Sequence, residues 1–115
     1  MVSVSNKPLT LSVPYAIRQN ARLGLQLRRK FNRGNRASYI AQKLITGNID
    51  VDTLQKILLY FKNHADDAKK KTAKGAWDTV TDPSDLYVDW LMHGGNKGLE
   101  YFAELIKNNH AILPR

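Results

Sequence analysis

The chain has 115 residues, of which 43% are hydrophobic and 24% charged, which suits one soluble domain with a single core. No apolar run approaches the roughly 20 residues needed to cross a membrane, and the absence of cysteine excludes disulfides and thiolate chemistry. The net charge is +8, with nine bases and no acid in the first 49 residues, against nine bases and ten acids afterwards. This imbalance predicts a negatively charged partner: a nucleic acid, an anionic membrane or an acidic protein surface.

The N-terminal part predicts an extended arm over residues 1–13, followed by one helical domain over 14–115. Pro14 suits the first turn of a helix, with Ser12 as a candidate cap. The helix should run from about 15 to 31, with an apolar face that includes Ile17, Ala21 and Leu25.

Two further helices are expected over about 36–46 and 50–63. The first has one apolar stripe, and Gly47 can end it in a left-handed conformation. Asp50 is a good N-cap for the second. A helix-turn-helix alignment fails, because the positions that should be apolar fall on four polar residues: Gln42, Asn48, Thr53 and Lys56. These two helices are therefore predicted to form an αα-hairpin of the core.

The last part of the chain predicts a polar segment and two more helices. Residues 65–75 form a charged loop or a frayed helix end. Asp82 and Pro83 predict a capped helix over about 83–93, and another helix is expected over 97–109. The aromatic residues of this part should belong to the core, with stacking on nucleic-acid bases as the lesser alternative. They are Trp77, Tyr87, Trp90, Tyr101 and Phe102. The apolar tail at 111–114 is expected to dock on the surface.

Seven bases, six of them Arg, lie between positions 18 and 36 with no acid among them. Arg binds phosphate through two parallel hydrogen bonds, so the cluster predicts contacts with nucleic-acid phosphates. The Gly34 loop is expected to offer backbone N–H groups to the same partner. The alternatives are a solvated helix face, or pairing with acids of the same chain. The candidate binding residues are Arg18, Arg22, Arg28, Arg29, Lys30, Arg33 and Arg36.

A stripe of acids, Asp82, Asp85 and Asp89, shares one face of the predicted 83–93 helix. Helix capping and a solvated face explain it most simply. The stripe is also a candidate surface for homo-oligomers, by pairing with the Arg cluster of a second copy, and the same pairing can close within one chain.

Catalytic and metal-binding patterns are weak. His64 with Asp66 and Asp67 is a candidate acid–base or metal cluster, but a helix end followed by solvated acids explains it better. The three histidines have no paired ligand spacing. We therefore expect no enzyme activity, no cofactor and no metal.

Three ordered blocks, spread over about residues 14–102, resemble a small domain of bacteriophage and prophage proteins. The first runs from Asn20 to Arg28 and continues with Arg33-Gly34; the second runs from Ala41 through Tyr60-Phe61 to His64; the third is Val88–Gly95. Asn63 and Met92-His93 depart from the family pattern. The family has no established activity, so the resemblance implies a phage origin and no catalytic residues.

Together these observations predict an all-α bundle of about five helices. The expected function is binding of nucleic acid through backbone phosphates, without sequence specificity. The alternative is a virion structural protein whose basic face docks on an acidic capsid, portal or neighbouring-subunit surface. A third hypothesis is a small regulator that binds an acidic host protein surface. No membrane partner is expected, and the expected location is the host cytoplasm during infection, or the virion.

Overall fold

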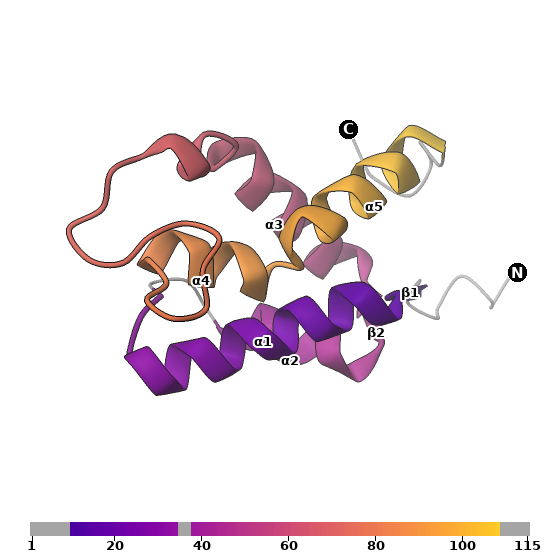
Figure 1. Ribbon diagram of the computed structural model, residues 1–115. Helices are drawn as coiled ribbons and strands as arrows, with labels where there is room; N and C mark the ends of the chain where they lie inside the picture. Colours follow the sequence, from indigo (N-terminus) through magenta and orange to yellow (C-terminus); the bar gives the residue numbers. More distant parts are fainter. Residues whose placement is uncertain (1–9, 35–37, 109–115) are drawn as a thin grey trace, which may run out of the picture.

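The computed structural model describes residues 10–34 and 38–108, and this part of the chain is mostly helical (Figure 1). The all-α prediction is confirmed: the structure is 67% helical, with a very small two-stranded sheet. The strands are β1 (Thr10–Ser12) and β2 (Asn48–Asp50). The helices are α1 (Tyr15–Phe31), α2 (Ser38–Thr46), α3 (Val51–Asn63), the 3-10 turn η2 (Asp67–Lys69), α4 (Asp85–Met92) and α5 (Gly95–Asn108).

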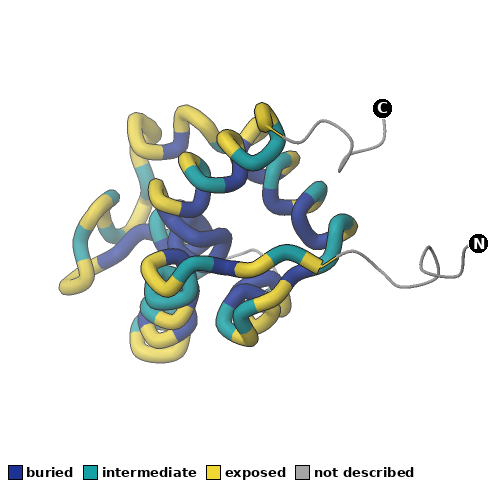
Figure 2. Tube along the Cα trace, turned by 90° about the vertical axis from the view of Figure 1, so that its right-hand side faces the viewer, coloured by how far each residue is buried: buried dark blue, intermediate teal, exposed yellow. Residues whose placement is uncertain are grey.

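Helix α1 is the centre of the fold and has the predicted bounds. It packs most closely against α2 and α4, and it also touches α5. Its buried side includes Ile17, Ala21 and Leu25, as predicted, while the opposite side stays exposed (Figure 2). Gly24 permits the close approach of α4, because a Cβ there would lie 2.8 Å from the backbone nitrogen of Met92.

The small sheet joins the N-terminal arm to the segment between α2 and α3. Strands β1 and β2 are antiparallel, with Leu11 opposite Ile49. The backbone N–H of Val13 also donates to the carbonyl of Gly47 over 2.9 Å. The predicted extended arm is a strand at residues 10–12, and its first nine residues lie outside the described part.

Helices α2 and α3 do not form the predicted αα-hairpin. They are not among the closely packed pairs of helices; α2 instead packs on α1, and α3 contacts α5. The short connection between them contains β2, and their side chains meet where Lys43 Nζ donates to the Thr53 hydroxyl at 3.4 Å. Asp50 caps α3 as predicted, since its carboxylate accepts the backbone N–H of Thr53 at 2.8 Å.

Helix α4 begins two residues later than predicted. Its N-cap is Ser84, which accepts the backbone N–H of Tyr87, and Asp82 and Pro83 precede the helix. Asp82 does not cap because its backbone carbonyl accepts from Ala76 N and its carboxylate binds Arg33.

Helix α5 begins at Gly95, two residues earlier than predicted. It buries Phe102, as predicted, and leaves Ala103 exposed. The predicted docking of the tail at 111–114 lies outside the described residues. In the described part of the chain, no helix combines the length and apolar character that a membrane span requires.

Candidate nucleic-acid interface

The exposed side of α1 carries three cations of the predicted cluster. Arg22, Arg29 and Lys30 are exposed. The helix contains no acid along its 17 residues, so no neighbour on the helix itself neutralises them. Two of them, Arg22 and Arg29, are seven residues apart and therefore project from the same side of the helix, about 10.5 Å apart along its axis.

Arg18 extends this basic side toward the start of α1, where it is half-buried. Its guanidinium carbon lies 5.6 Å from the ring centre of Tyr15, within the range of a cation–π contact. Its Nε is buried and makes no hydrogen bond with the described residues. Arg18 therefore has a packing role as well as a charge.

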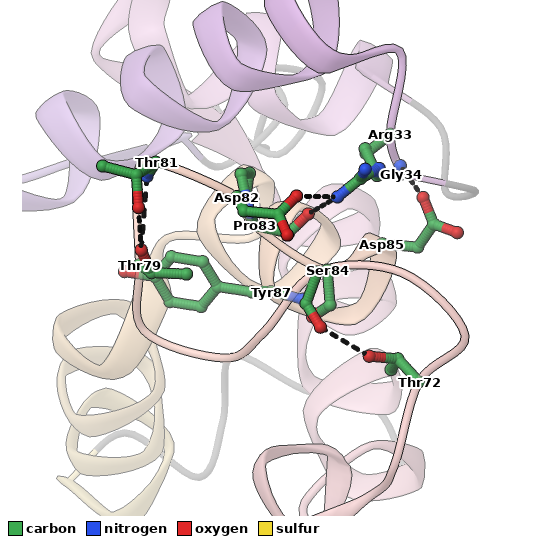
Figure 3. Close-up of polar contacts among 11 residues, drawn as sticks. Arg33, Gly34, Thr72, Thr79, Thr81, Asp82, Pro83, Ser84, Asp85 and Tyr87 are labelled. Carbon is green, nitrogen blue, oxygen red and sulfur yellow. Dashed lines mark hydrogen bonds and ion pairs between the residues drawn. The ribbon is translucent and has the colours of Figure 1, made fainter.

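Arg28 and Arg33, by contrast, are used in holding the chain together. Arg28 Nη1 donates to the carbonyl of Gly34 at 2.9 Å. Arg33 Nη1 donates to the Asp82 carboxylate at 2.8 Å and to the carbonyl of Pro83 at 2.7 Å (Figure 3). The Arg33 side chain is only 18% exposed. The Arg33 contacts fasten the exit of α1 to the segment before α4, and the Arg28 contact holds the exit loop against α1.

The Gly34 loop was expected to offer its backbone N–H groups to a phosphate, but the N–H of Gly34 is already used within the chain. This N–H donates to the Asp85 carboxylate at 2.7 Å (Figure 3). Gly34 has a φ of +102°, and a Cβ there would lie 3.2 Å from the Asp89 carboxylate. A glycine is needed because the loop runs close against α4 in a left-handed conformation. Arg36 lies outside the described residues.

The acidic stripe faces this same loop. Asp82 binds Arg33, Asp85 binds Gly34, and Asp89 is only 2% exposed. The burial of Asp89 contradicts the simple interpretation of a solvated face. Pairing with the Arg cluster of the same chain, which the sequence left open, is thus observed for Asp82, whereas Asp85 accepts a backbone N–H.

A second basic segment, expected from the sequence to be a charged loop or a frayed helix end, has its last residue beside Arg33. Its Lys side chains are exposed, and Lys70 also pairs with Asp67 at 2.8 Å. A Cβ at Gly75 would lie 2.6 Å from Arg33 Nη1, so the segment ends against the exit of α1. The run of lysines in KKKTAK is the sequence signal that could have added this segment to the candidate binding residues. Its contact with Arg33 has no local signal, because it depends on the tertiary structure. The residues are Lys69, Lys70, Lys71 and Lys74.

The cluster around His64 is built as a packed turn. His64 Nδ1 lies 2.8 Å from the carboxylate of Asp67, whose side chain is fully buried, whereas Asp66 is exposed. The Tyr60 ring stacks on His64 at 4.5 Å and on His93 at 3.6 Å between ring centres. Among residues 10–34 and 38–108, no three His, Cys, Asp or Glu side chains form a metal-binding group.

Comparison with known proteins gives no further identification. No family model, no curated protein and no solved structure matches the chain. The resemblance to a phage-associated domain therefore remains a prediction from the sequence.

Proposed function

We propose that the protein binds nucleic acid through the backbone phosphates, without sequence specificity, in a bacteriophage context. The observation that carries this proposal is the exposed, acid-free side of α1 with Arg22, Arg29 and Lys30. Each Arg can give two parallel hydrogen bonds to one phosphate. Arg22 and Arg29 lie about 10.5 Å apart along the helix, far enough to contact two different phosphates.

The contacts inside the chain support this assignment of roles. Arg33 and Arg28 hold the exit of α1, which leaves the more exposed cations to meet the partner. The exposed Lys69, Lys71 and Lys74 add positive charge in the segment that ends beside this exit. Such contacts fix position on a strand but carry no base information, so binding should not depend on sequence.

Charge reversal on α1 tests the proposal. The double variant Arg22→Glu/Arg29→Glu should lose nearly all affinity for duplex DNA in a filter-binding assay, because it replaces two attractions with two repulsions. Both side chains are exposed, so folding should be retained and is checked by circular dichroism.

A matched control separates the effect of position from that of net charge. Lys62→Glu/Lys107→Glu makes the same change in net charge at exposed positions on α3 and α5. The proposal requires a much smaller loss of affinity in this control. An equal loss in the two variants would show that only the overall charge matters, and an unchanged affinity in the α1 variant would exclude α1 as the interface.

A virion structural role is the second candidate. Tyr15 is 67% exposed on the same helix and contacts Arg18, and exposed Tyr with Arg is typical of protein interfaces. Stoichiometric amounts of the protein in purified particles, together with loss of incorporation in the Arg22→Glu/Arg29→Glu variant, would favour this role.

A further inference from the structure

A pocket of about 200 Å³ lies between α1, α4, the start of α5 and the loop before α4, apart from the phosphate contacts proposed above. Its volume is below the roughly 300 Å³ of most pockets for drug-sized ligands, so it suits one small planar group. Asn20 contributes the α1 side of the wall. The other residues that matter for its chemistry are Trp77, Asp78, Tyr87, Trp90, Asn96 and Lys97.

Three aromatic rings form a fixed wall of the pocket. The Trp77 ring packs edge-on against Tyr87 and against Trp90, with 5.3 Å between centres and 63° between planes in each pair. Trp90 is buried and its Nε1 donates to Asn96 at 2.8 Å, which holds its orientation. Trp77 and Tyr87 are only half-buried, and so they keep aromatic surface available to a ligand.

Asp78 places a carboxylate at this aromatic wall at a cost in backbone strain. Its φ is +59°, in the left-handed region that residues other than Gly seldom adopt. The Tyr87 hydroxyl is 3.4 Å from the carboxylate, longer than the 2.5–3.0 Å of an ordinary O–H···O bond. An ionised carboxylate has about four acceptor sites, so this weak contact leaves most of them for a ligand.

We propose that this pocket binds a single unpaired nucleobase, with guanine preferred. Flat aromatic side chains stack on bases of any sequence, and unpaired bases are read through hydrogen bonds to their edges. Guanine alone among the common bases presents two adjacent N–H donors, N1–H and the 2-amino group, which match the acceptors of Asp78. Lys97, exposed on the rim, can meet the attached phosphate.

Two charged side chains line the pocket, Asp78 and Lys97. Asp78 would attract a methylated ammonium ion, the other ligand that aromatic pockets favour, whereas Lys97 would repel it and attracts the phosphate of a nucleotide; tetramethylammonium is therefore the competing probe in the test. The base can come from a free nucleotide or from a single strand. Binding of a base within a strand rests on the nucleic-acid binding proposed above, whereas binding of a free nucleotide does not.

Intrinsic fluorescence tests the proposal, because both tryptophans of the chain line this pocket. Guanosine monophosphate should change the emission in a saturable way, at lower concentrations than the adenosine, cytidine and uridine monophosphates. A single strand of alternating G and T should change it more than the same strand in a duplex. Absence of a saturable change with every nucleotide and with the strand overturns the proposal, as does a response to tetramethylammonium alone.

Asp78→Asn tests the role of the carboxylate, since Asn keeps the shape and also tolerates a positive φ. The variant should bind guanosine monophosphate about tenfold more weakly and lose the preference for guanine, in line with the value of a bidentate base contact. Asp66→Asn, at an exposed position just before η2, is the matched control and should bind guanosine monophosphate as the native protein does. Unchanged guanine preference in Asp78→Asn overturns the assignment.

The Arg22→Gln/Arg29→Gln variant separates this inference from the proposed function. It should bind duplex DNA weakly yet retain the fluorescence response to guanosine monophosphate. If the native protein fails to bind duplex DNA but responds to the nucleotide, the phosphate interface is wrong and the pocket stands.

Discussion

Arg33 shows how a side chain that looks like part of a binding surface can serve the fold. One nitrogen of its guanidinium bridges the Asp82 carboxylate and the Pro83 carbonyl, on the far side of a long loop. Because the side chain is only 18% exposed, removing it leaves a carbonyl group without its donor in a largely dry place.

Arg33→Ala should therefore lower the free energy of unfolding by about 1.5–3 kcal/mol, the usual value of hydrogen bonds to a charged group. Urea denaturation measures this, with Arg29→Ala as the exposed control, which should change stability by less than about 0.5 kcal/mol. The reverse ranking, with Arg29 the more important for stability, would contradict the division of roles on α1.

Asp50 links a helix cap to the pH dependence of stability. Hydrogen bonding by Thr53 lowers the pKa of the Asp50 carboxyl below its ordinary value of 3.8. A carboxyl with a lowered pKa in the folded state stabilises the fold above its unfolded pKa, and this stabilisation is lost as the pH falls through the folded pKa.

Asp50→Ala should cost about 1 kcal/mol at neutral pH, as for other N-caps. The difference from the native protein should shrink in urea denaturation below about pH 4. Asp50→Asn is the control, because Asn also caps helices but does not titrate. A cost of Asp50→Ala that is independent of pH would show that the charge of Asp50 does not contribute.

At the level of helices, the packing of α1 against α4 rests on a glycine. A Cβ at Gly24 would lie 2.8 Å from both the backbone nitrogen and Cγ of Met92, closer than real contacts allow. At a solvent-exposed helix position, replacing Gly by Ala stabilises the protein by up to about 1 kcal/mol. At Gly24 the new Cβ would clash with the backbone of α4, so the substitution should destabilise the protein instead.

Gly24→Ala should destabilise the protein by about 1–3 kcal/mol, as expected for overpacking. Gln26→Ala, on the exposed side of α1, should have little effect. Urea denaturation of both variants provides the measurement, and a more stable Gly24→Ala protein would mean that α1 and α4 are not so closely packed.

The sequence predicted elements whose determinants are local and failed where distant contacts decide. The bounds of α1 and the Asp50 cap follow from neighbouring residues, and both are confirmed. The start of α4 was wrong because Asp82 binds Arg33, 49 positions away. The β1–β2 pairing likewise joins segments far apart in the sequence. No local pattern reveals either contact.

For the molecule as a whole, fewer of the predicted binding residues are available to a partner than the sequence indicates. Of the seven predicted binding residues, Arg28 and Arg33 make internal contacts, and Arg36 lies outside the described part. What remains on α1 is Arg18, Arg22, Arg29 and Lys30, and the lysines of 69–74 add to it. The central prediction is that these cations release counterions from a nucleic acid.

The most direct measurement is the salt dependence of duplex DNA binding, between about 50 and 200 mM salt, for the native protein and for Arg22→Gln/Arg29→Gln. Each phosphate contact contributes about −0.9 to the log–log slope, so the variant should have a slope shallower by about 1.8. Lys62→Gln/Lys107→Gln, with the same net charge, should keep nearly the native slope. Equal slopes for the native protein and the α1 variant would contradict phosphate binding by this helix.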